Sequence, residues 1–392
     1  MTMEATMAVY ILSGARTPSG SFMGALSSVP APRLGAVAIK GALANAQISG
    51  DKVGEVFMGN VIQTGEGQAP ARQAALFAEL PESVPCTTVN KVCGSGMKTI
   101  IMGAQSILAG DNNLVVAGGM ENMSMIPHFV GGSRSGTKFG HIEMKDTLLH
   151  DGLWDVYTNR AMGNCAEECV TKFNFSRQAQ DAFAIESFKR AQQAMKEGIF
   201  KKEIVPVTIK GKAGDVVISE DEGPMTAKFD KIPALKPAFD KNGSITAANA
   251  STINDGASAV VLGGEEYRSK AKFKIVAYAG HAQNPTWFTT APAAAMKKCL
   301  EKAHLKLSDI DLFEINEAFA CVTMAAMTEL ALDHSKVNIY GGGVSLGHPI
   351  GNSGTRIVVT LMNAMEQKKS KYGMASICIG GGEALSLILE RL

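Results

Sequence analysis

The sequence predicts an α/β protein built from two similar halves, with an inserted loop domain between them. Strand-like and helix-like segments alternate along the chain, as is typical of layered α/β folds. Short stretches also recur: Glu55–Asn60 matches Asp311–Asn316, and Leu114–Gly119 resembles Ser376–Gly381. Residues 123–251 break the alternation and are rich in glycine, lysine, aspartate and proline. Insertions of this kind commonly carry substrate recognition.

The individual elements follow from the spacing of apolar residues and from the turn-forming residues that bound them. We expect strands at Ala8–Leu12, Glu55–Asn60, Leu114–Ala117, Leu312–Ile315, Val337–Tyr340 and Ala375–Ile379. We expect helices at Leu34–Ala46, Gly96–Leu108, Ala293–Ala303, Cys321–Leu330 and Gly354–Glu366, with Arg177–Glu197 inside the insertion. The predicted N-terminal half covers 1–122 and is completed by 252–272, the insertion covers 123–251, and the C-terminal half covers 273–392.

The repeat also predicts where a site would lie. Two similar halves would stack two sheets around shared helices. Ligands of open α/β sheets bind beyond the carboxyl ends of the strands. We therefore expect the active site where the strand ends of the two halves meet.

Composition excludes several function classes. The chain has 392 residues, of which 46% are apolar and 19% charged, and its net charge of +1 gives no overall field for nucleic acid. No apolar run reaches the roughly 20 residues needed to cross a membrane. Met1–Gly14 lacks the features of a signal or transit peptide and predicts a first strand. Seven irregularly spaced cysteines indicate free thiols in a reducing compartment, which we take to be the cytoplasm, and they show no metal-ligand pattern.

One cysteine stands out by its position. Cys93 follows an extended apolar approach and precedes Gly94, Gly96 and a predicted helix. The unpaired N–H groups and the dipole of a helix N-terminus favour a thiolate, so we expect the pKa of Cys93 to lie below the usual value of about 8.5. Because most intracellular cysteines are small buried hydrophobic residues, this pattern alone leaves a purely structural role open.

Three further candidates lie in the C-terminal part of the chain, two of them in or beside glycine-rich loops. His348 lies in a Gly/Pro loop and is expected to titrate near neutral pH, although it could simply bond a loop carbonyl. Cys378 ends a predicted strand before Gly380–Gly382, whose backbone N–H groups could bind an oxyanion. Asn316 follows a further strand. A dinucleotide-binding loop around His348 is disfavoured because a His-Pro pair interrupts the turn.

These four elements, in this order and at these separations, resemble the thiolases. The matching stretches are Cys93–Gly96, Asn316–Phe319, Gly347–Gly351 and Cys378–Gly382, and the resemblance extends over the whole chain. It implies the layered αβαβα fold of that family. Within the family the chain looks most like the acetoacetyl-CoA thiolases. That likeness implies a reversible condensation of two acetyl-CoA molecules to acetoacetyl-CoA and CoA through an acyl-cysteine.

The resemblance also implies a role for each candidate. Cys93 would be acylated while His348 takes its proton, and Cys378 would remove the carbon-bound proton of the second acetyl-CoA. His348 and a water held by Asn316 would stabilise the enolate. The backbone N–H groups of Cys93 and Gly380 would form a second oxyanion hole for the tetrahedral intermediate.

Substrate binding is assigned by weaker matches, for which ordinary core packing stays the alternative. The residues implied to line the tunnel for the pantetheine arm are Leu153, Met162, Phe239, Ala247, Ser251, Phe288, Ala318 and Phe319. No cofactor is predicted. A potassium ion is kept only as an alternative, since Ala247–Ser251 resembles a potassium-site stretch but Pro224 replaces its tyrosine. The expected partners are acetyl-CoA, acetoacetyl-CoA and CoA, and the expected assembly is a homotetramer, a dimer of dimers.

Three other functions are weighed against this one. A broader-range 3-ketoacyl-CoA thiolase would share every motif and differ in the length of its tunnel. A decarboxylating ketoacyl synthase needs no base for a carbon-bound proton, so Cys378 disfavours it. A non-catalytic CoA- or lipid-binding module is disfavoured because Cys93, His348, Cys378 and Asn316 are all present.

Overall fold

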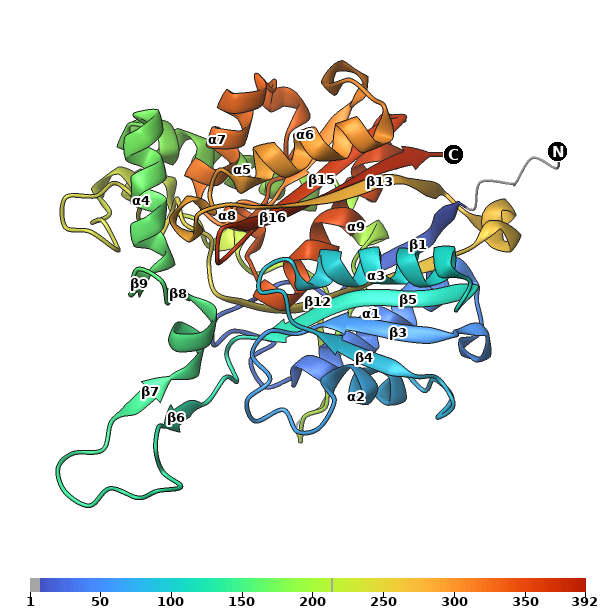
Figure 1. Ribbon diagram of the computed structural model, residues 1–392, viewed down its shortest axis with the longest axis horizontal. Helices are drawn as coiled ribbons and strands as arrows, with labels where there is room; N and C mark the ends of the chain where they lie inside the picture. The colour runs from blue at the N-terminus through green and yellow to red at the C-terminus, as the bar shows by residue number, and fades with distance from the viewer. Residues whose placement is uncertain (1–7, 213) are drawn as a thin grey trace.

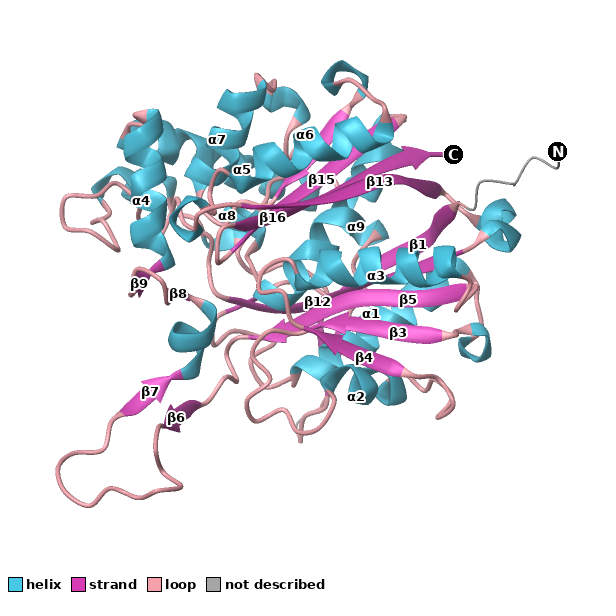
Figure 2. Ribbon diagram, in the orientation of Figure 1, coloured by secondary structure: helices cyan, strands magenta, loops and turns pink. Residues whose placement is uncertain are grey.

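The computed structural model describes residues 8–212 and 214–392, which form two stacked half-sheets with helices between and outside them (Figure 1). Helices α3 (Ser95–Ala109) and α9 (Ile350–Lys368) lie between the half-sheets and contact each other. Helix α1 (Ala31–Ala46) covers the outer face of one half-sheet, and α6 (Ala291–Ala303) covers that of the other. The predicted layered α/β fold is confirmed (Figure 2).

The two halves share one order of elements, except at one position. The N-terminal half adds β1 (Val9–Arg16), β3 (Glu55–Gly59), α2 (Pro70–Phe77), β4 (Cys86–Val89), β5 (Leu114–Asn122) and β12 (Asn254–Gly263). The C-terminal half adds β13 (Phe273–Ala282), β14 (Leu312–Ile315), α7 (Ala320–Leu330), α8 (Gly343–Leu346), β15 (Tyr372–Ile379) and β16 (Glu383–Arg391). Strand β3 corresponds to β14, and β5 corresponds to β15, but helix α8 of the C-terminal half stands where strand β4 stands in the N-terminal half.

Strand pairing follows the same repeat. In each half a parallel pair, β3 with β5 or β14 with β15, is extended by antiparallel neighbours. The full order is β14-β15-β16-β13-β1-β12-β5-β3-β4. Strands β1 and β13 join the halves through three residue pairs, from Val9–Ile275 to Ile11–Phe273. The short β2 (Gly20–Ser21) pairs with β12.

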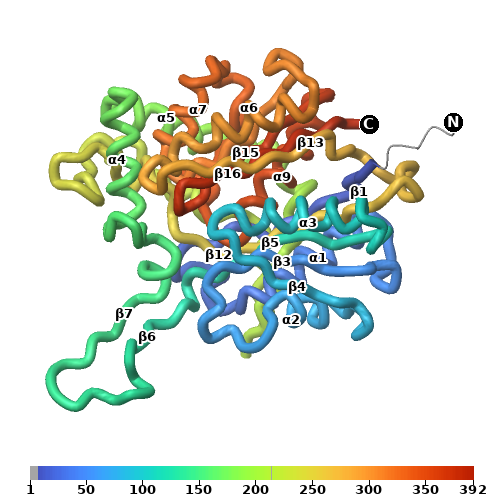
Figure 3. The backbone as a smooth tube through the Cα atoms, viewed as in Figure 1, coloured from blue at the N-terminus to red at the C-terminus, as the bar shows by residue number. Residues whose placement is uncertain are grey.

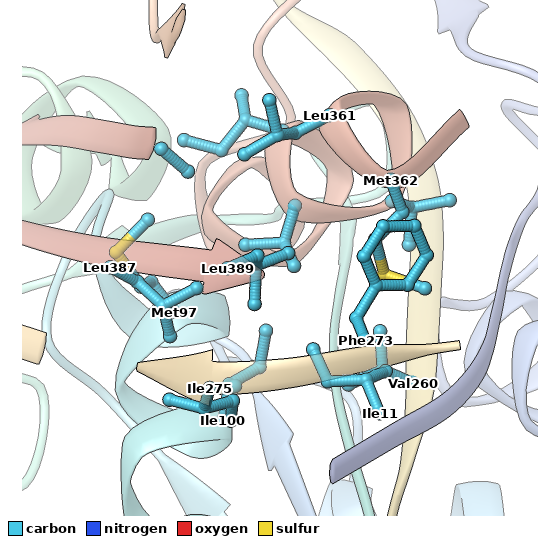
Figure 4. Packing of buried hydrophobic residues seen from close by; sticks show 14 of the residues in the cluster. Ile11, Met97, Ile100, Val260, Phe273, Ile275, Leu361, Met362, Leu387 and Leu389 are labelled. Carbon is cyan, nitrogen blue, oxygen red and sulfur yellow. The ribbon is translucent and has the colours of Figure 1, made fainter. Parts of the chain in front are cut away.

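The largest hydrophobic cluster lies between the two half-sheets (Figure 4). Met97 and Ile100 of α3 and Leu361 of α9 contribute to it, together with side chains from strands of both halves, such as Val260 of β12 and Leu387 of β16. These five residues are almost completely buried. The two halves therefore share one core.

The segment between β5 and β12, which we predict to be an inserted loop domain over 123–251, has little sheet structure. Its helices are α4 (Met162–Phe173) and α5 (Arg177–Lys196). Its short strand pairs are β6 (His128–Val130) with β7 (Met144–Asp146), β8 (Trp154–Asp155) with β9 (Arg160–Ala161), and β10 (Val207–Ile209) with β11 (Val216–Ile218). The β6–β7 hairpin extends away from the body (Figure 3). No helix of the described residues is both long and apolar enough to cross a membrane.

One predicted strand is wrong. Val337–Tyr340 does not form a strand, although Val337 makes one parallel bridge to Phe313. Asn338 interrupts the extended run with a positive φ of 47°, and its side chain bonds the backbone N–H and C=O of Ile315 instead. Strands β4, β12, β13 and β16 and helices α2 and α4 were not among the predicted elements. The predicted first strand corresponds to β1, while residues 1–7 lie outside the described part of the chain.

Candidate active site

A cavity of about 600 Å³ lies where the two halves and the insertion meet, and it collects most of the predicted site residues. Cys93 reaches it from the N-terminal half, while His348, Cys378 and Gly380 reach it from the C-terminal half. The predicted substrate-binding residues also line it, namely Leu153, Met162, Phe239, Ala247, Ser251, Phe288, Ala318 and Phe319. Asn316 does not line the cavity but lies behind His348.

Cys93 lies in a tight turn at the start of α3. Gly94 is the N-cap, and Val92 on the other side has a φ of +45°, which is strained for a β-branched residue. Such backbone costs about 1–3 kcal/mol and persists only where its surroundings enforce it. The approach of the halves is close here, since a Cβ on Gly94 would lie 2.4 Å from Cδ1 of Ile379. The turn therefore presents the thiol to the C-terminal half.

The charge state of Cys93 differs from the sequence-based expectation. Burial raises the pKa of its thiol to about 11, although hydrogen bonds from the backbone N–H groups of Gly380 and of Cys93 itself act to lower it. The negative charge of Glu121 adds to the increase. The prediction of a lowered pKa is thus wrong, because desolvation outweighs the N–H groups at the helix start. Cys93 is a neutral thiol at neutral pH.

His348 is likewise neutral, and its tautomer is fixed. Burial, followed by the positive charge of Arg356, lowers the pKa of His348 to about 3, so the expectation of titration near neutral pH is wrong. Its Nδ1 lies 2.5 Å from Oγ of Ser353, and that hydroxyl donates its hydrogen to the carbonyl of Pro349 at 2.8 Å. Ser353 can therefore only accept from Nδ1–H, which leaves the Nε2 lone pair free to accept a proton.

Asn316 follows β14 and is completely buried. Its Nδ2 lies 3.5 Å from Nε2 of His348. Its Oδ1 has no hydrogen-bond partner among the described residues. A buried amide oxygen without a partner is costly, and a bound water or a substrate group would satisfy it. The next residue, Glu317, accepts hydrogen bonds from Ser187, Asn338 and the N–H of Val344, which ties this turn to the loop that carries His348.

Cys378 lies at the end of β15 and is 1% exposed. Burial and the nearby Cys93 raise the pKa of its thiol well above the usual value. The three-residue turn after β15 needs glycine at two positions, because Gly381 and Gly382 have φ values of 90° and 87°. This turn directs the N–H of Gly380 to the sulfur of Cys93. The two thiols and the N–H donors of both halves therefore converge on one point.

Sequence reasoning missed two groups that support the site. Ser353 fixes the tautomer of His348, yet it appears in the sequence only as the start of a helix. Glu121 is completely buried and accepts hydrogen bonds from the N–H groups of Val61, Ile62 and Gly351 at 3.0, 3.1 and 2.9 Å. It thereby holds the start of α9 to the N-terminal half. Burial raises the pKa of Glu121 to about 7 despite these donors. Its position directly after Met120 in a buried strand was the available signal.

The neutral charge states lead to a test by alkylation. We expect the rate at which iodoacetamide modifies Cys93 to rise about tenfold per pH unit up to about pH 10, because only the thiolate reacts. Mass spectrometry of the peptide that contains Cys93 would measure the rate, and Cys93→Ala would serve as the blank. A rate that levels off near pH 7 would instead show a stable thiolate–imidazolium pair between Cys93 and His348.

Comparison with known proteins agrees with this geometry. Residues 9–266 match the family model "Thiolase, N-terminal domain" and residues 269–391 match "Thiolase, C-terminal domain". An acetyl-CoA acetyltransferase of Schizosaccharomyces pombe is 49% identical over 98% of this chain and 99% of its own length. The mitochondrial acetyl-CoA acetyltransferase of Mus musculus is 52% identical over 98% of this chain and 91% of its own.

Solved structures give the same result. A thiolase of Ascaris suum in complex with coenzyme A has a TM-score of 0.93 and 44% identity, covering 98% of this chain and 100% of that one. The acetyl-CoA acetyltransferase of Bacillus anthracis has a TM-score of 0.96 and 39% identity, covering 99% and 100%. Since both family models and full-length relatives match, the chain belongs to the thiolase family.

Proposed function

We propose that the chain is an acetyl-CoA C-acetyltransferase, which condenses two acetyl-CoA molecules to acetoacetyl-CoA and CoA and catalyses the reverse thiolysis. The full-length relatives named acetyl-CoA acetyltransferase support this activity. The observation that carries the mechanism is the convergence of Cys93, Cys378 and a neutral His348 on one cavity. The apolar lining of that cavity suits the slender thioester arm of CoA.

In the first half-reaction the sulfur of Cys93 attacks the carbonyl carbon of acetyl-CoA. Because Cys93 starts as a thiol, its proton passes to the free Nε2 of His348 as the bond forms. The carbonyl oxygen becomes an oxyanion, which the N–H groups of Cys93 and Gly380 stabilise, each donor being worth about 3 kcal/mol. CoA leaves with a proton from His348, and Cys93 remains as an acetyl thioester.

In the second half-reaction the thiol proton of Cys378 passes to the free Nε2 of His348, and the resulting thiolate removes a proton from the methyl group of another acetyl-CoA. Acetyl-Cys93 carries no negative charge and therefore does not oppose a thiolate at the neighbouring Cys378. The enolate oxygen accepts hydrogen bonds from the now protonated Nε2 of His348 and from a water on Asn316, whose Oδ1 has no hydrogen-bond partner in the described residues. The enolate carbon attacks acetyl-Cys93, and acetoacetyl-CoA leaves as Cys93 takes the proton back from His348 and its thiol reforms.

This chemistry sets the proposed partners. The nucleophile and both proton-transfer groups are side chains of the chain itself, so the proposal includes acetyl-CoA, acetoacetyl-CoA and CoA and no cofactor. We also infer a cytoplasmic location. All seven cysteines of the chain lie in the described residues and are free thiols, which supports a reducing compartment.

A trapping experiment combined with a substrate series tests the function. Labelled acetyl-CoA, quenched in acid, is expected to leave the acetyl group on Cys93. For thiolysis of 3-ketoacyl-CoA substrates we expect the highest kcat/KM for acetoacetyl-CoA and 2-methylacetoacetyl-CoA, with a fall of at least about tenfold at six carbons, since larger groups must displace Phe288 or Phe319. A flat series up to long chains would favour the broader-range 3-ketoacyl-CoA thiolase. An unlabelled Cys93 in active protein would overturn the mechanism.

We further propose a homotetramer that assembles through the β6–β7 hairpin. Phe139, Ile142 and Met144 on this hairpin are 100%, 63% and 68% exposed, and apolar side chains so exposed on a projecting segment favour contact with a second copy. The native chain should therefore sediment at about 165 kDa, four times its 41.3 kDa mass.

Phe139→Ser combined with Ile142→Ser should lower that mass to a dimer of about 83 kDa, because the hairpin would lose its apolar contact. Analytical ultracentrifugation would measure the change. Met225→Ser, at another exposed apolar residue, is the matched control and should leave the mass unchanged. An unaltered mass in the hairpin variant would contradict the proposed contact.

A further inference from the structure

An ion pair joins the two loops that carry the catalytic thiols. Nζ of Lys91 lies 2.5 Å from Oε2 of Glu383. Lys91 is two residues before Cys93 in the N-terminal half, and Glu383 directly follows the Gly380–Gly382 turn in the C-terminal half. Their side chains are 27% and 38% exposed. Neither residue lines the cavity.

The N–H donors beside this pair come from different halves. One is the N–H of Cys93 and the other is the N–H of Gly380, and both reach the sulfur of Cys93. An oxyanion hole works only when its donors lie about 2.7–3.1 Å from the position of the developing oxyanion. The distance between the two loops therefore decides whether the hole is complete.

Each loop is well fixed internally. On the nucleophile side the N–H of Lys91 donates to Oγ of Ser95 at 2.8 Å, and that hydroxyl donates to the carbonyl of Val92 at 2.7 Å. On the other side β16 begins at Glu383, and a Cβ on Gly382 would lie 2.4 Å from the carbonyl oxygen of Gln283. The apolar contact of Gly94 with Ile379 brings the loops together but has no preferred direction. The charged hydrogen bond between Lys91 and Glu383 is directional and therefore fixes how the two loops are placed relative to each other.

We propose that Lys91 and Glu383 form a positioning pair that sets the separation of the Cys93 and Gly380 N–H groups in the oxyanion hole of the acylation step. This inference rests on the proposed function. A partly exposed ion pair contributes little to the free energy of unfolding. Its role is therefore in kcat, through placement of donors that are each worth a factor of about 10²–10³.

The test uses Lys91→Met, Glu383→Gln and the charge-exchanged double variant Lys91→Glu with Glu383→Lys. We expect each single variant to lower kcat for thiolysis of acetoacetyl-CoA about tenfold, with KM within about twofold and an almost unchanged melting temperature. The double variant should recover part of kcat. At saturating substrate, 1 M NaCl should lower kcat of the native enzyme toward the Glu383→Gln value and leave that variant unaffected, because salt screens the pair.

Lys40 and Glu79 supply the matched control, since they form another exposed ion pair, at 2.7 Å, outside the cavity. Lys40→Met and Glu79→Gln should leave kcat unchanged. Unchanged kcat in the Lys91 and Glu383 single variants would overturn the proposal. So would a rise in KM for CoA confined to Lys91→Met, since it would show that Lys91 contacts the ligand. Failure of the proposed function would appear separately, as native enzyme that carries no labelled acetyl group on Cys93.

Discussion

Cys93→Ala is expected to lower both condensation and thiolysis by at least about 10⁴-fold, because the acyl group then has no nucleophile to accept it. The substitution removes one sulfur and leaves the N–H groups of Cys93 and Gly380 in place. The protein should therefore stay folded and still bind acetyl-CoA. Steady-state assays in both directions, with calorimetric titration of CoA, would measure this separation of binding from turnover.

Cys86→Ala is the matched control, since Cys86 is also only partly buried but lies in β4 outside the cavity. Its activity should stay within about twofold of the native enzyme. Full thiolysis by Cys93→Ala would remove the acyl-cysteine from the mechanism. It would also favour the alternative function, a non-catalytic CoA- or lipid-binding module.

Cys378→Ala should separate the two half-reactions. We expect acetylation of Cys93 by labelled acetyl-CoA to continue, because that step uses Cys93, His348 and the N–H of Gly380. Condensation should fall about 10³–10⁴-fold, since no other group in the proposed mechanism removes the carbon-bound proton. Rapid-quench measurement of acetyl-enzyme, beside the steady-state rate, would show both effects. Exchange of deuterium into the methyl group of acetyl-CoA should be lost as well.

Cys321→Ala controls for a cavity in the core. Cys321 is fully buried in the same apolar cluster as Cys378 but does not line the active-site cavity. A loss of stability common to both variants would reflect packing. A loss of condensation confined to Cys378→Ala would reflect proton transfer. If Cys378→Ala kept condensation while Cys321→Ala did too, the second thiol would have no chemical role.

The placement of three candidate residues was predictable because each lies at or after the end of a strand. Cys93, Asn316 and Cys378 all lie at or after strand ends, and such ends gather at one edge of an α/β sheet. The internal repeat added that two such edges face each other. Strand positions were clear where an apolar run was bounded by turns, as in Glu55–Gly59 and Leu312–Ile315.

The remaining features depend on tertiary surroundings. The pKa values of Cys93 and His348 are set mainly by burial, which the local sequence does not show. The sequence predicts a lowered pKa for Cys93 and a near-neutral one for His348, whereas burial raises the first and lowers the second. The Lys91–Glu383 contact joins residues that are 292 positions apart in the sequence. Residues Val337–Tyr340 have the composition of a strand but do not form one. The side chain of Asn338 makes the hydrogen bonds to the backbone N–H and C=O of Ile315 that a neighbouring strand would otherwise make. Contacts between residues distant in the sequence, and the effect of burial on pKa values, therefore could not be predicted from the single sequence.

The repeat has a consequence for how such a molecule diverges. Asn60 and Asn316 occupy equivalent places, each directly after the matching strand β3 or β14, and both are completely buried. The amide of Asn60 lies beside the carboxylate of Glu121, whereas that of Asn316 lies beside His348. If gene duplication produced the halves, Asn60 kept a structural role while Asn316 acquired a role in the reaction. Selection then acts on the two copies differently, although each still directly follows its strand.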